Sequence, residues 1–251
     1  MRQITRQHRS AQGGFTMVVI AALFAAFSVI AAIAVERASV MQFIAQRNAA
    51  VDQLTRISNA MIEYGVVNKT GTTLLYPCPA PDNVADTAGA FGASTVNCYN
   101  AALDPISGVA LLGGDTIRGM VPVQTLAAYG IGFNDAFDPW NNRIVYVVNR
   151  RLTLGSPTSA GAQATNPAVT SPIVTFTIQL QDFVLISYGK DGLGGIKRGS
   201  TTVGIACTNG TATYRYENCD NDTSLYTLPT NTSTTATSGT YFDDIVTHYR
   251  Q

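Results

Sequence analysis

The first 65 residues show two hydrophobic patterns in succession. Residues 15–35 form an apolar run of 21 positions without a charge, a Pro or a Gly, and only Thr16 and Ser28 in it are polar. A helix of this length is about 31 Å long, which is enough to span the hydrocarbon core of a bilayer. The first pattern therefore predicts a membrane-spanning helix.

Beyond residue 35 the pattern becomes amphipathic and contains no helix breaker before Gly65. Apolar residues recur at spacings of three, four or seven, at Val40, Ile44, Val51, Leu54, Ile57, Met61 and Tyr64. The pattern predicts a continuous helix over residues 15–65 that ends at Gly65. Its second half presents an apolar stripe on which a globular domain can pack.

Residues 66–251 have the patterns of a β-rich domain. Runs of β-branched and aromatic residues typical of strands occupy residues 144–148, 173–180, 183–188 and 241–246. Gln181-Asp182 is not a tight-turn pair, so a bulge or a crossing between sheets is expected there. A small hairpin is expected around Asn209-Gly210. Irregular or loop structure is expected over residues 66–121, 153–171 and 223–240, and residues 116–126 look like a lead-in to a short helix.

A short basic leader precedes the apolar run. It contains Arg2, Arg6 and Arg9, and no acid occurs before Glu36. Positive charge favours the cytoplasmic side, so the amino terminus should stay in the cytoplasm and the remainder should be exported. A secretory signal peptide is the alternative, but its apolar core would be shorter and followed by a small-residue cleavage site.

The segment GGFTMVVIAALFAAFSVIAAIAVERA at residues 13–38 resembles the prepilin signature of type IV pilins and type II secretion pseudopilins. In that family prepilin peptidase cuts after the glycine and methylates the new amino-terminal Phe, which implies a cut between Gly14 and Phe15. The resemblance implies a pilin-like α+β fold, a long helix packed on an antiparallel β-sheet head. The implied parts are a leader at 1–14, a helix at 15–65 and an exported head at 66–251. An uncut membrane anchor is the alternative.

One position departs from this signature. The family usually has Glu at the fifth mature residue, where it pairs with the amino-terminal ammonium of a neighbouring subunit, and here that residue is Val19. A carboxylate within a membrane is costly and is kept only for function. Pseudopilins at a filament tip lack this Glu, so Val19 favours a minor, tip-proximal or atypical subunit. The alternative is a lineage that assembles without the pair.

The cysteines form two local pairs, Cys78/Cys98 and Cys207/Cys219, on the exported side, where disulfides persist. Four cysteines allow three connectivities. We predict the sequential pairing because both loops are short and close at low entropic cost. Neither pair has the CxxC spacing and the mature chain would keep one His, so no zinc site is expected.

Two motifs in the head resemble motifs of major pseudopilins. Residues 138–142 (Asp-Pro-Trp-Asn-Asn) are similar to an Asp-Pro-Trp-Gly-Asn turn, and we expect Trp140 to fill the core. Residues 187–195 are similar to a Ser-x-Gly-x-Asp-Gly-x-x-Gly-Gly loop that, with a later Asp before Ile, binds calcium. The resemblance implies that the calcium ligands are Asp191 with Asp243 or Asp244. Residues 192–242 separate the two parts, so this insertion either replaces the ion or keeps the geometry with a longer arm.

Net charge is zero, and no basic patch suggests nucleic acid as a partner. The chain has no GxSxG, P-loop, GxGxxG or HExxH motif, so no enzyme is expected. The resemblance implies a structural subunit of a type II secretion pseudopilus or a type IV pilus-like filament. Its partners would be other pilin or pseudopilin subunits, prepilin peptidase and the inner membrane, with the head in the periplasm. A surface-binding minor type IV pilin and a monomeric membrane-anchored periplasmic protein are the alternatives.

Overall fold

The computed structural model describes residues 10–94, 98, 110–113, 116–153, 168–170, 179–204, 224–226 and 244–250. The chain divides into two compact units, Met1–Gln46 and Arg47–Gln251. A long helix, α1 (Ser10–Val67), begins in the first unit and ends in the second.

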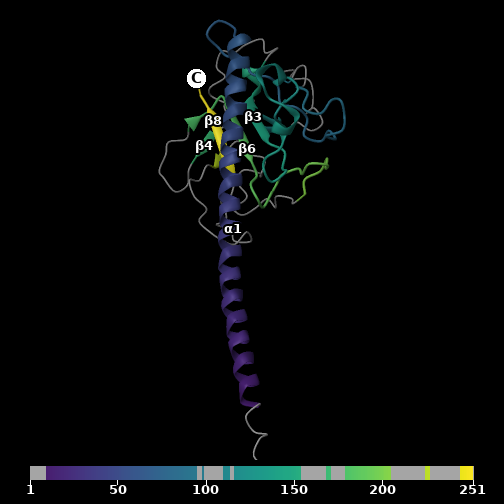
Figure 1. Ribbon diagram of the computed structural model, residues 1–251. Helices are drawn as coiled ribbons and strands as arrows, with labels where there is room; N and C mark the ends of the chain where they lie inside the picture. Colours follow the sequence, from purple (N-terminus) through teal and green to yellow (C-terminus); the bar gives the residue numbers. More distant parts are fainter. Residues whose placement is uncertain are drawn as a thin grey trace, which may run out of the picture. The chain divides into compact units, whose positions relative to one another are not determined.

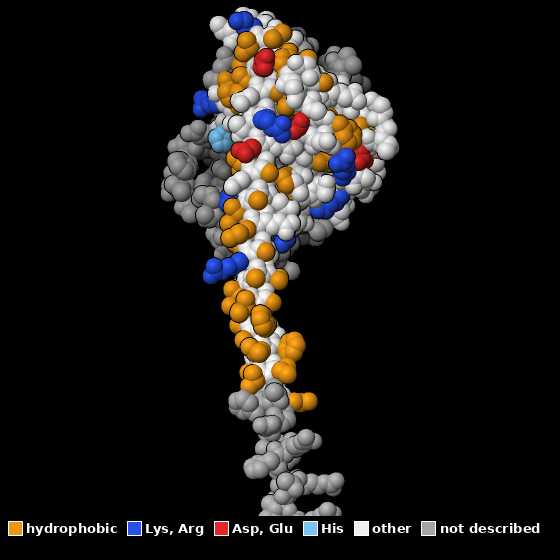
Figure 2. Space-filling model, in the orientation of Figure 1, with side chains coloured by type: hydrophobic (Ala, Val, Ile, Leu, Met, Phe, Trp, Pro, Cys, Tyr) orange, Lys and Arg blue, Asp and Glu red, His pale blue; other side chains and the backbone are white. Residues whose placement is uncertain are grey.

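The first unit is helical throughout its described residues, and its apolar side chains face outward. Every described side chain from residue 17 to residue 35 is exposed. Figure 2 shows these hydrophobic side chains around the helix surface. The helix is long and apolar enough to cross a membrane by length and composition. This agrees with the membrane-spanning helix that the first hydrophobic pattern predicts.

The last third of α1 belongs to the second unit and packs into its core. The buried apolar residues of this part of the helix are Ala50, Leu54, Ile57, Ala60 and Met61, and Gln53 and Ser58 are buried polar residues. Val40, Ile44 and Val51 follow the same apolar spacing but are 54%, 52% and 41% exposed. The apolar stripe predicted from the sequence is therefore longer than the part of the helix that is buried in the domain. Periodicity identifies one face of a helix, but it does not show where along that face a partner begins.

The expected helix end at Gly65 is also wrong, because α1 continues to Val67. A Cβ atom at Gly65 would stand 3.1 Å from Tyr76 Cε1 and 3.2 Å from Leu74 Cβ. Glycine at this position accommodates the close approach of the segment that follows the helix, and it does not act as a left-handed cap.

The described residues of the second unit include a five-stranded antiparallel sheet in the order β1-β2-β3-β6-β8 (Figure 1). Its strands are β1 (Ala110–Gly113), β2 (Thr116–Met120), β3 (Val145–Asn149), β6 (Phe183–Ser187) and β8 (Ile245–Tyr249). The expected strands at 144–148 and 183–188 are confirmed as β3 and β6. The described closing strand starts later than expected, at Ile245. The long helix and the sheet together give an α+β fold.

The expectation for residues 116–126 is wrong in its first half, since residues 116–120 form β2 within the sheet. The short 3-10 helices η1 (Ala127–Tyr129) and η2 (Phe133–Ala136) follow later. Four of the five β2 residues are buried, so no alternation of apolar and polar positions marks this strand.

A second sheet in the described residues contains β4 (Ala168–Thr170), β5 (Gln179–Leu180) and β7 (Ser224–Tyr226), in the order β5-β4-β7. The chain passes from β5 to β6 of the larger sheet at Gln181-Asp182, which confirms the expected crossing. β4 and β7 lie in segments expected to be loops, and they pair in parallel. The expected hairpin around Asn209-Gly210 lies outside the described residues.

Both faces of the larger sheet are buried at β3 and β6. Tyr146 and Val148 of β3 belong to the main core with the helix, whereas Val147 belongs to a second cluster on the other face. A sheet covered on both sides needs apolar residues at every position, which explains the continuous apolar runs of β3 and β6. Trp140 is partly buried and packs against the main core, as expected from the sequence.

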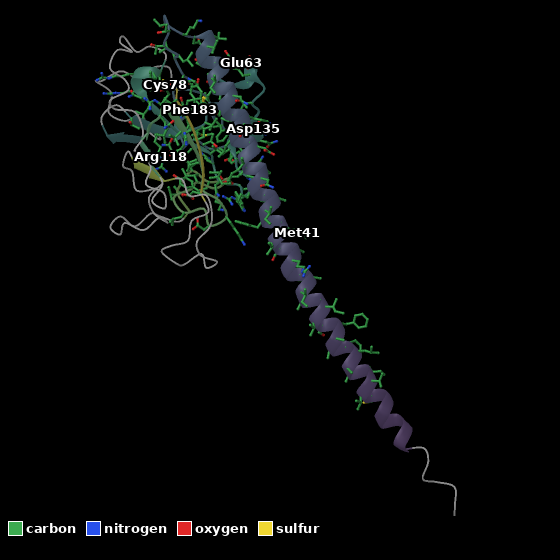
Figure 3. The ribbon with its side chains drawn as sticks, turned by 90° about the vertical axis from the view of Figure 1, so that its left-hand side faces the viewer. Met41, Glu63, Cys78, Arg118, Asp135 and Phe183 are labelled. Atoms are coloured by element: carbon green, nitrogen blue, oxygen red, sulfur yellow. A yellow bond between two sulfur atoms is a disulfide. The ribbon has the colours of Figure 1, made fainter. Side chains whose placement is uncertain are left out.

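Polar contacts also connect the helix to the segment ahead of residues 138–142. Arg56 Nη2 lies 2.8 Å from Asp135 Oδ1, and Figure 3 shows Asp135 beside α1. The buried amide of Gln53 donates to the carbonyl of Phe137 at 2.8 Å. The helix thereby holds the start of the turn that forms the candidate site.

Candidate functional site

Residues 138–142 form a tight turn. The Asp138 amide donates to the Asn142 carbonyl at 2.8 Å, and the Asn141 amide donates to the Asp138 carbonyl at 2.9 Å. Asn141 has a φ of 64°, in the left-handed region. Asparagine tolerates this region better than most residues other than glycine. Asn141 can therefore replace the Gly of the similar pseudopilin turn.

The carboxylate of Asp138 is the centre of a buried hydrogen-bond network. One oxygen accepts from the backbone amides of Trp140 (3.0 Å) and Asn142 (2.8 Å). The other accepts from Asn142 Nδ2 (3.1 Å) and Ser187 Oγ (2.7 Å). Asp138 is only 4% exposed. Burial raises the pKa of Asp138, and the hydrogen bonds from Ser187, Asn142 and Trp140 act against that rise.

The network joins the two motifs that the sequence showed separately. Ser187 ends β6, and the loop that follows is closed by backbone bonds from Gly192 to Tyr188 (3.2 Å) and from Gly195 to Gly192 (3.0 Å). Asn142 Nδ2 also donates to the Gly189 carbonyl at 2.7 Å. We call residues 138–142 and 187–195 together the turn–loop site.

The side chain of Arg143 contacts the segments that surround this site. No sequence motif predicted this role. The side chain is 1% exposed and donates to the carbonyls of Asp82 and Ser200. It lies 3.6 Å from Asp86 and 5.0 Å above the Phe91 ring. Burial lowers the pKa of Arg143, and the charges of Asp86 and Asp82 oppose this effect. An arginine beside an apolar strand gives no sequence signal for such burial.

The start of the loop also meets the first residue of the closing segment. Ile245 of β8 pairs with Ser187, so Asp244 lies opposite the beginning of the loop. Tyr188 is 1% exposed, and Arg118 donates to its hydroxyl. Burial raises the pKa of Tyr188 to about 12, with Arg118 lowering it and Asp244 raising it. The fold thus brings Asp244 to the same end of the sheet as the loop of Asp191.

The described residues test only part of the calcium site that the resemblance implies at Asp191 with Asp243 or Asp244. Asp191 Oδ1 accepts from the Leu193 amide at 3.0 Å, within its own loop, while the charge of Asp244 acts on the Tyr188 hydroxyl. Asp243 lies outside the described residues. No three His, Cys, Asp or Glu side chains cluster as a metal site in the described part of the chain. Calcium at Asp191 with Asp243 or Asp244 therefore stays a prediction from the resemblance.

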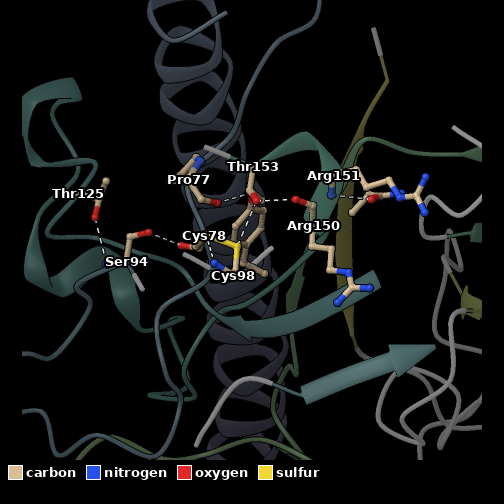
Figure 4. The surroundings of a disulfide bond; sticks show 10 residues. Pro77, Cys78, Ser94, Cys98, Thr125, Arg150, Arg151 and Thr153 are labelled. Carbon is tan, nitrogen blue, oxygen red and sulfur yellow. Dashed lines mark hydrogen bonds between the residues drawn. A yellow bond between two sulfur atoms is a disulfide. The ribbon is translucent and has the colours of Figure 1, made fainter. Parts of the chain in front are cut away.

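The disulfide between Cys78 and Cys98 confirms the first predicted pair (Figure 4). Both cysteines are buried in the main core. Ser94 Oγ donates to the Cys78 carbonyl at 2.9 Å, and Cys98 Sγ lies 3.2 Å from Thr153 Oγ1. The bridge therefore closes a loop within the long excursion after the helix, and its Cys98 end contacts Thr153, which follows β3. The second predicted pair, Cys207 and Cys219, lies outside the described residues.

The residues expected to take part in processing and assembly lie on α1. The backbone at Gly14 and Phe15 is helical. Val19 lies four residues after Phe15 and is 41% exposed. No protein-family model, curated protein or solved structure matched this chain in the comparisons.

Proposed function

We propose that this protein is a minor or atypical subunit of a type II secretion pseudopilus or type IV pilus-like filament. The first unit anchors the chain in the inner membrane, and the second unit lies in the periplasm or on the filament surface. The protein acts by assembly with other subunits through its N-terminal helix. Prepilin peptidase releases the assembly-competent chain by cutting between Gly14 and Phe15.

The observation that carries this proposal is the Gly14–Phe15 junction followed by a helix whose apolar side chains are exposed all around. The apolar window of this helix has none of its residues buried within the chain. Water is an unfavourable surrounding for such a surface, so lipid or other apolar helices must cover it. A membrane before assembly and a bundle of equivalent helices after assembly both satisfy this need.

The turn–loop site supports a structural role for the head. Its buried carboxylate is hydrogen-bonded to four donors that all come from the protein itself. A satisfied buried network of this kind rigidifies a fold and specifies its conformation. We infer that it holds the turn and the end of β6 in a fixed geometry.

Processing provides the direct test. In cells with active prepilin peptidase, the mature protein should begin at Phe15 and carry an N-methyl group. Intact-mass analysis of membrane-extracted protein measures both properties. Gly14→Val, which places a bulky side chain at the scissile bond, should leave the chain uncut, and the neighbouring Gly13→Ala should not. An unprocessed wild-type chain that begins at Met1 would contradict the filament proposal.

Because position 19 is Val, we predict that this protein assembles poorly with copies of itself. In a filament interior, the ammonium of each incoming Phe15 would lie in a low dielectric and require a carboxylate, which Val19 does not provide. Expressed without other pilins, the wild-type chain should form few filaments. Val19→Glu should increase them if a neighbour's ammonium lies within reach, as counted by electron microscopy of sheared fractions.

Two control variants separate charge position from polarity. Val19→Gln adds a polar group similar in size to Glu but without a charge. Val18→Glu moves the carboxylate by about 100° around the helix. Neither should increase the filament count. If the wild-type chain alone forms abundant filaments, Val19 is no handicap and the protein is a major subunit.

A further inference from the structure

Two polar atoms converge on the backbone of Gly192 in the turn–loop site. Gly192 has a φ of 63°, and a Cβ atom there would stand 2.7 Å from Asn142 Oδ1 and 3.2 Å from Lys197 Nζ. The first distance is too short for any side chain to fit without a shift. Gly192 is therefore required both by its conformation and by the close approach of these two groups.

The Asn142 side chain leaves one acceptor open at this point. Asn142 is fully buried, and its Nδ2 donates to Asp138 and to the Gly189 carbonyl. Its Oδ1 has no hydrogen-bond partner. A buried acceptor without a donor is costly, so this position favours a neighbouring positive charge or a strong donor.

Lys197 is held beside this acceptor by its backbone. Residues 142 and 197 form an antiparallel bridge. The Arg198 amide donates to the Asn141 carbonyl at 2.8 Å, and the Lys197 carbonyl accepts from the Ser200 amide at 3.0 Å. The side chain is exposed to solvent and reaches back over the turn, where Nζ donates to the Trp140 carbonyl at 3.4 Å.

We propose that the ammonium of Lys197 is the resident cation of the turn–loop site, in place of a bound divalent ion. Its charge faces the Trp140 carbonyl and lies near the open Oδ1 of Asn142, whose Nδ2 donates to the buried carboxylate of Asp138. The positive charge of this ammonium also repels a calcium ion from the turn–loop site. The proposal goes beyond filament assembly and does not depend on it, because it concerns only the stability of the head.

Thermal unfolding of the full-length chain in detergent tests the proposal. Trp140 is the only tryptophan and lies in the turn, so its fluorescence reports the site directly. Lys197→Met removes the charge and keeps the length of the side chain. Lys69→Met is the control, because Lys69, like Lys197, is an exposed lysine, and it lies outside the turn–loop site. Each protein is heated in millimolar calcium and in excess chelator.

The wild-type protein should melt at the same temperature with calcium and with chelator. Lys197→Met should melt about 2–4 °C lower in chelator, whereas Lys69→Met should melt like the wild type. A higher melting temperature of the wild type in calcium would show that the protein binds the ion and would overturn the proposal. Equal melting of Lys197→Met and Lys69→Met would overturn it as well.

Discussion

Asp138→Ala should lower the free energy of unfolding of the second unit by about 3–5 kcal/mol. The change removes the acceptor of the Trp140 and Asn142 amides, the Asn142 side chain and the Ser187 hydroxyl. These donors lie in a region where Asp138 is 4% exposed, so water does not readily replace the carboxylate. Urea unfolding of the full-length protein in detergent, followed by Trp140 fluorescence, measures the loss.

Asp191→Ala is the matched control for this prediction. Asp191 lies in the same site and accepts from the Leu193 amide, but it is only partly buried. Its removal should cost about 1 kcal/mol or less. If both variants lose the same stability, the Asp138 network is not the element that holds the two motifs together.

The pKa of Asp138 adds a pH dependence with a defined sign. Burial raises this pKa in the folded state above the ordinary value of Asp, near 4. The folded state therefore binds the proton more tightly than the unfolded state. The stability contributed by Asp138 is complete below pH about 4 and decreases as the pH rises through the folded pKa. The difference between wild type and Asp138→Ala should thus be smaller at pH 7 than at pH 4; a larger difference at pH 7 would show that the hydrogen bonds outweigh burial.

Loss of the Cys78–Cys98 disulfide should have a comparable effect. Replacing both cysteines by alanine should lower the free energy of unfolding by about 2–5 kcal/mol. The bridge closes a loop with a sequence separation of 20 residues and lies in the main core, so its loss frees the unfolded chain and leaves a cavity. The same urea experiment, under non-reducing conditions, measures this change.

Peptide mapping without reduction checks the pairing itself. It should recover one peptide pair joined through Cys78 and Cys98 and another joined through Cys207 and Cys219. Free thiols at these positions, or a link between Cys78 and Cys219, would contradict the sequential pairing. Replacing both Cys207 and Cys219 by alanine provides the comparison for the stability that is lost with the Cys78–Cys98 disulfide.

The hydrophobic pattern was sufficient to predict the elements with a simple environment. An uncharged run of 21 residues has only one favourable conformation in a membrane, which is a helix. The strands β3 and β6 were likewise visible, because continuous β-branched and aromatic residues suit a sheet buried on both faces. The pairing of Cys78 with Cys98 followed from the low entropic cost of a short loop.

Elements whose role depends on distant contacts were not predicted. β2 shows no alternation of apolar and polar residues, and its pairing with β1 and β3 makes it a strand. Gly65 resembles a helix stop in the sequence, but the helix continues to Val67, and Leu74 and Tyr76 approach Gly65 closely. The apolar stripe gave no sign that burial would begin near Ala50.

In the candidate site, too, local features could be predicted from the sequence and contacts between distant segments could not. By itself the sequence determined that residues 138–142 form a turn and that residues 187–195 form a glycine-rich loop, because both are encoded by local conformational preferences. Only the tertiary structure decided that Asp138 of the turn accepts from Ser187 of the loop, and that the Lys197 ammonium donates to the Trp140 carbonyl. Hydrogen bonds between segments that are tens of residues apart depend on how β3 and β6 pair, and local sequence carries no record of that register.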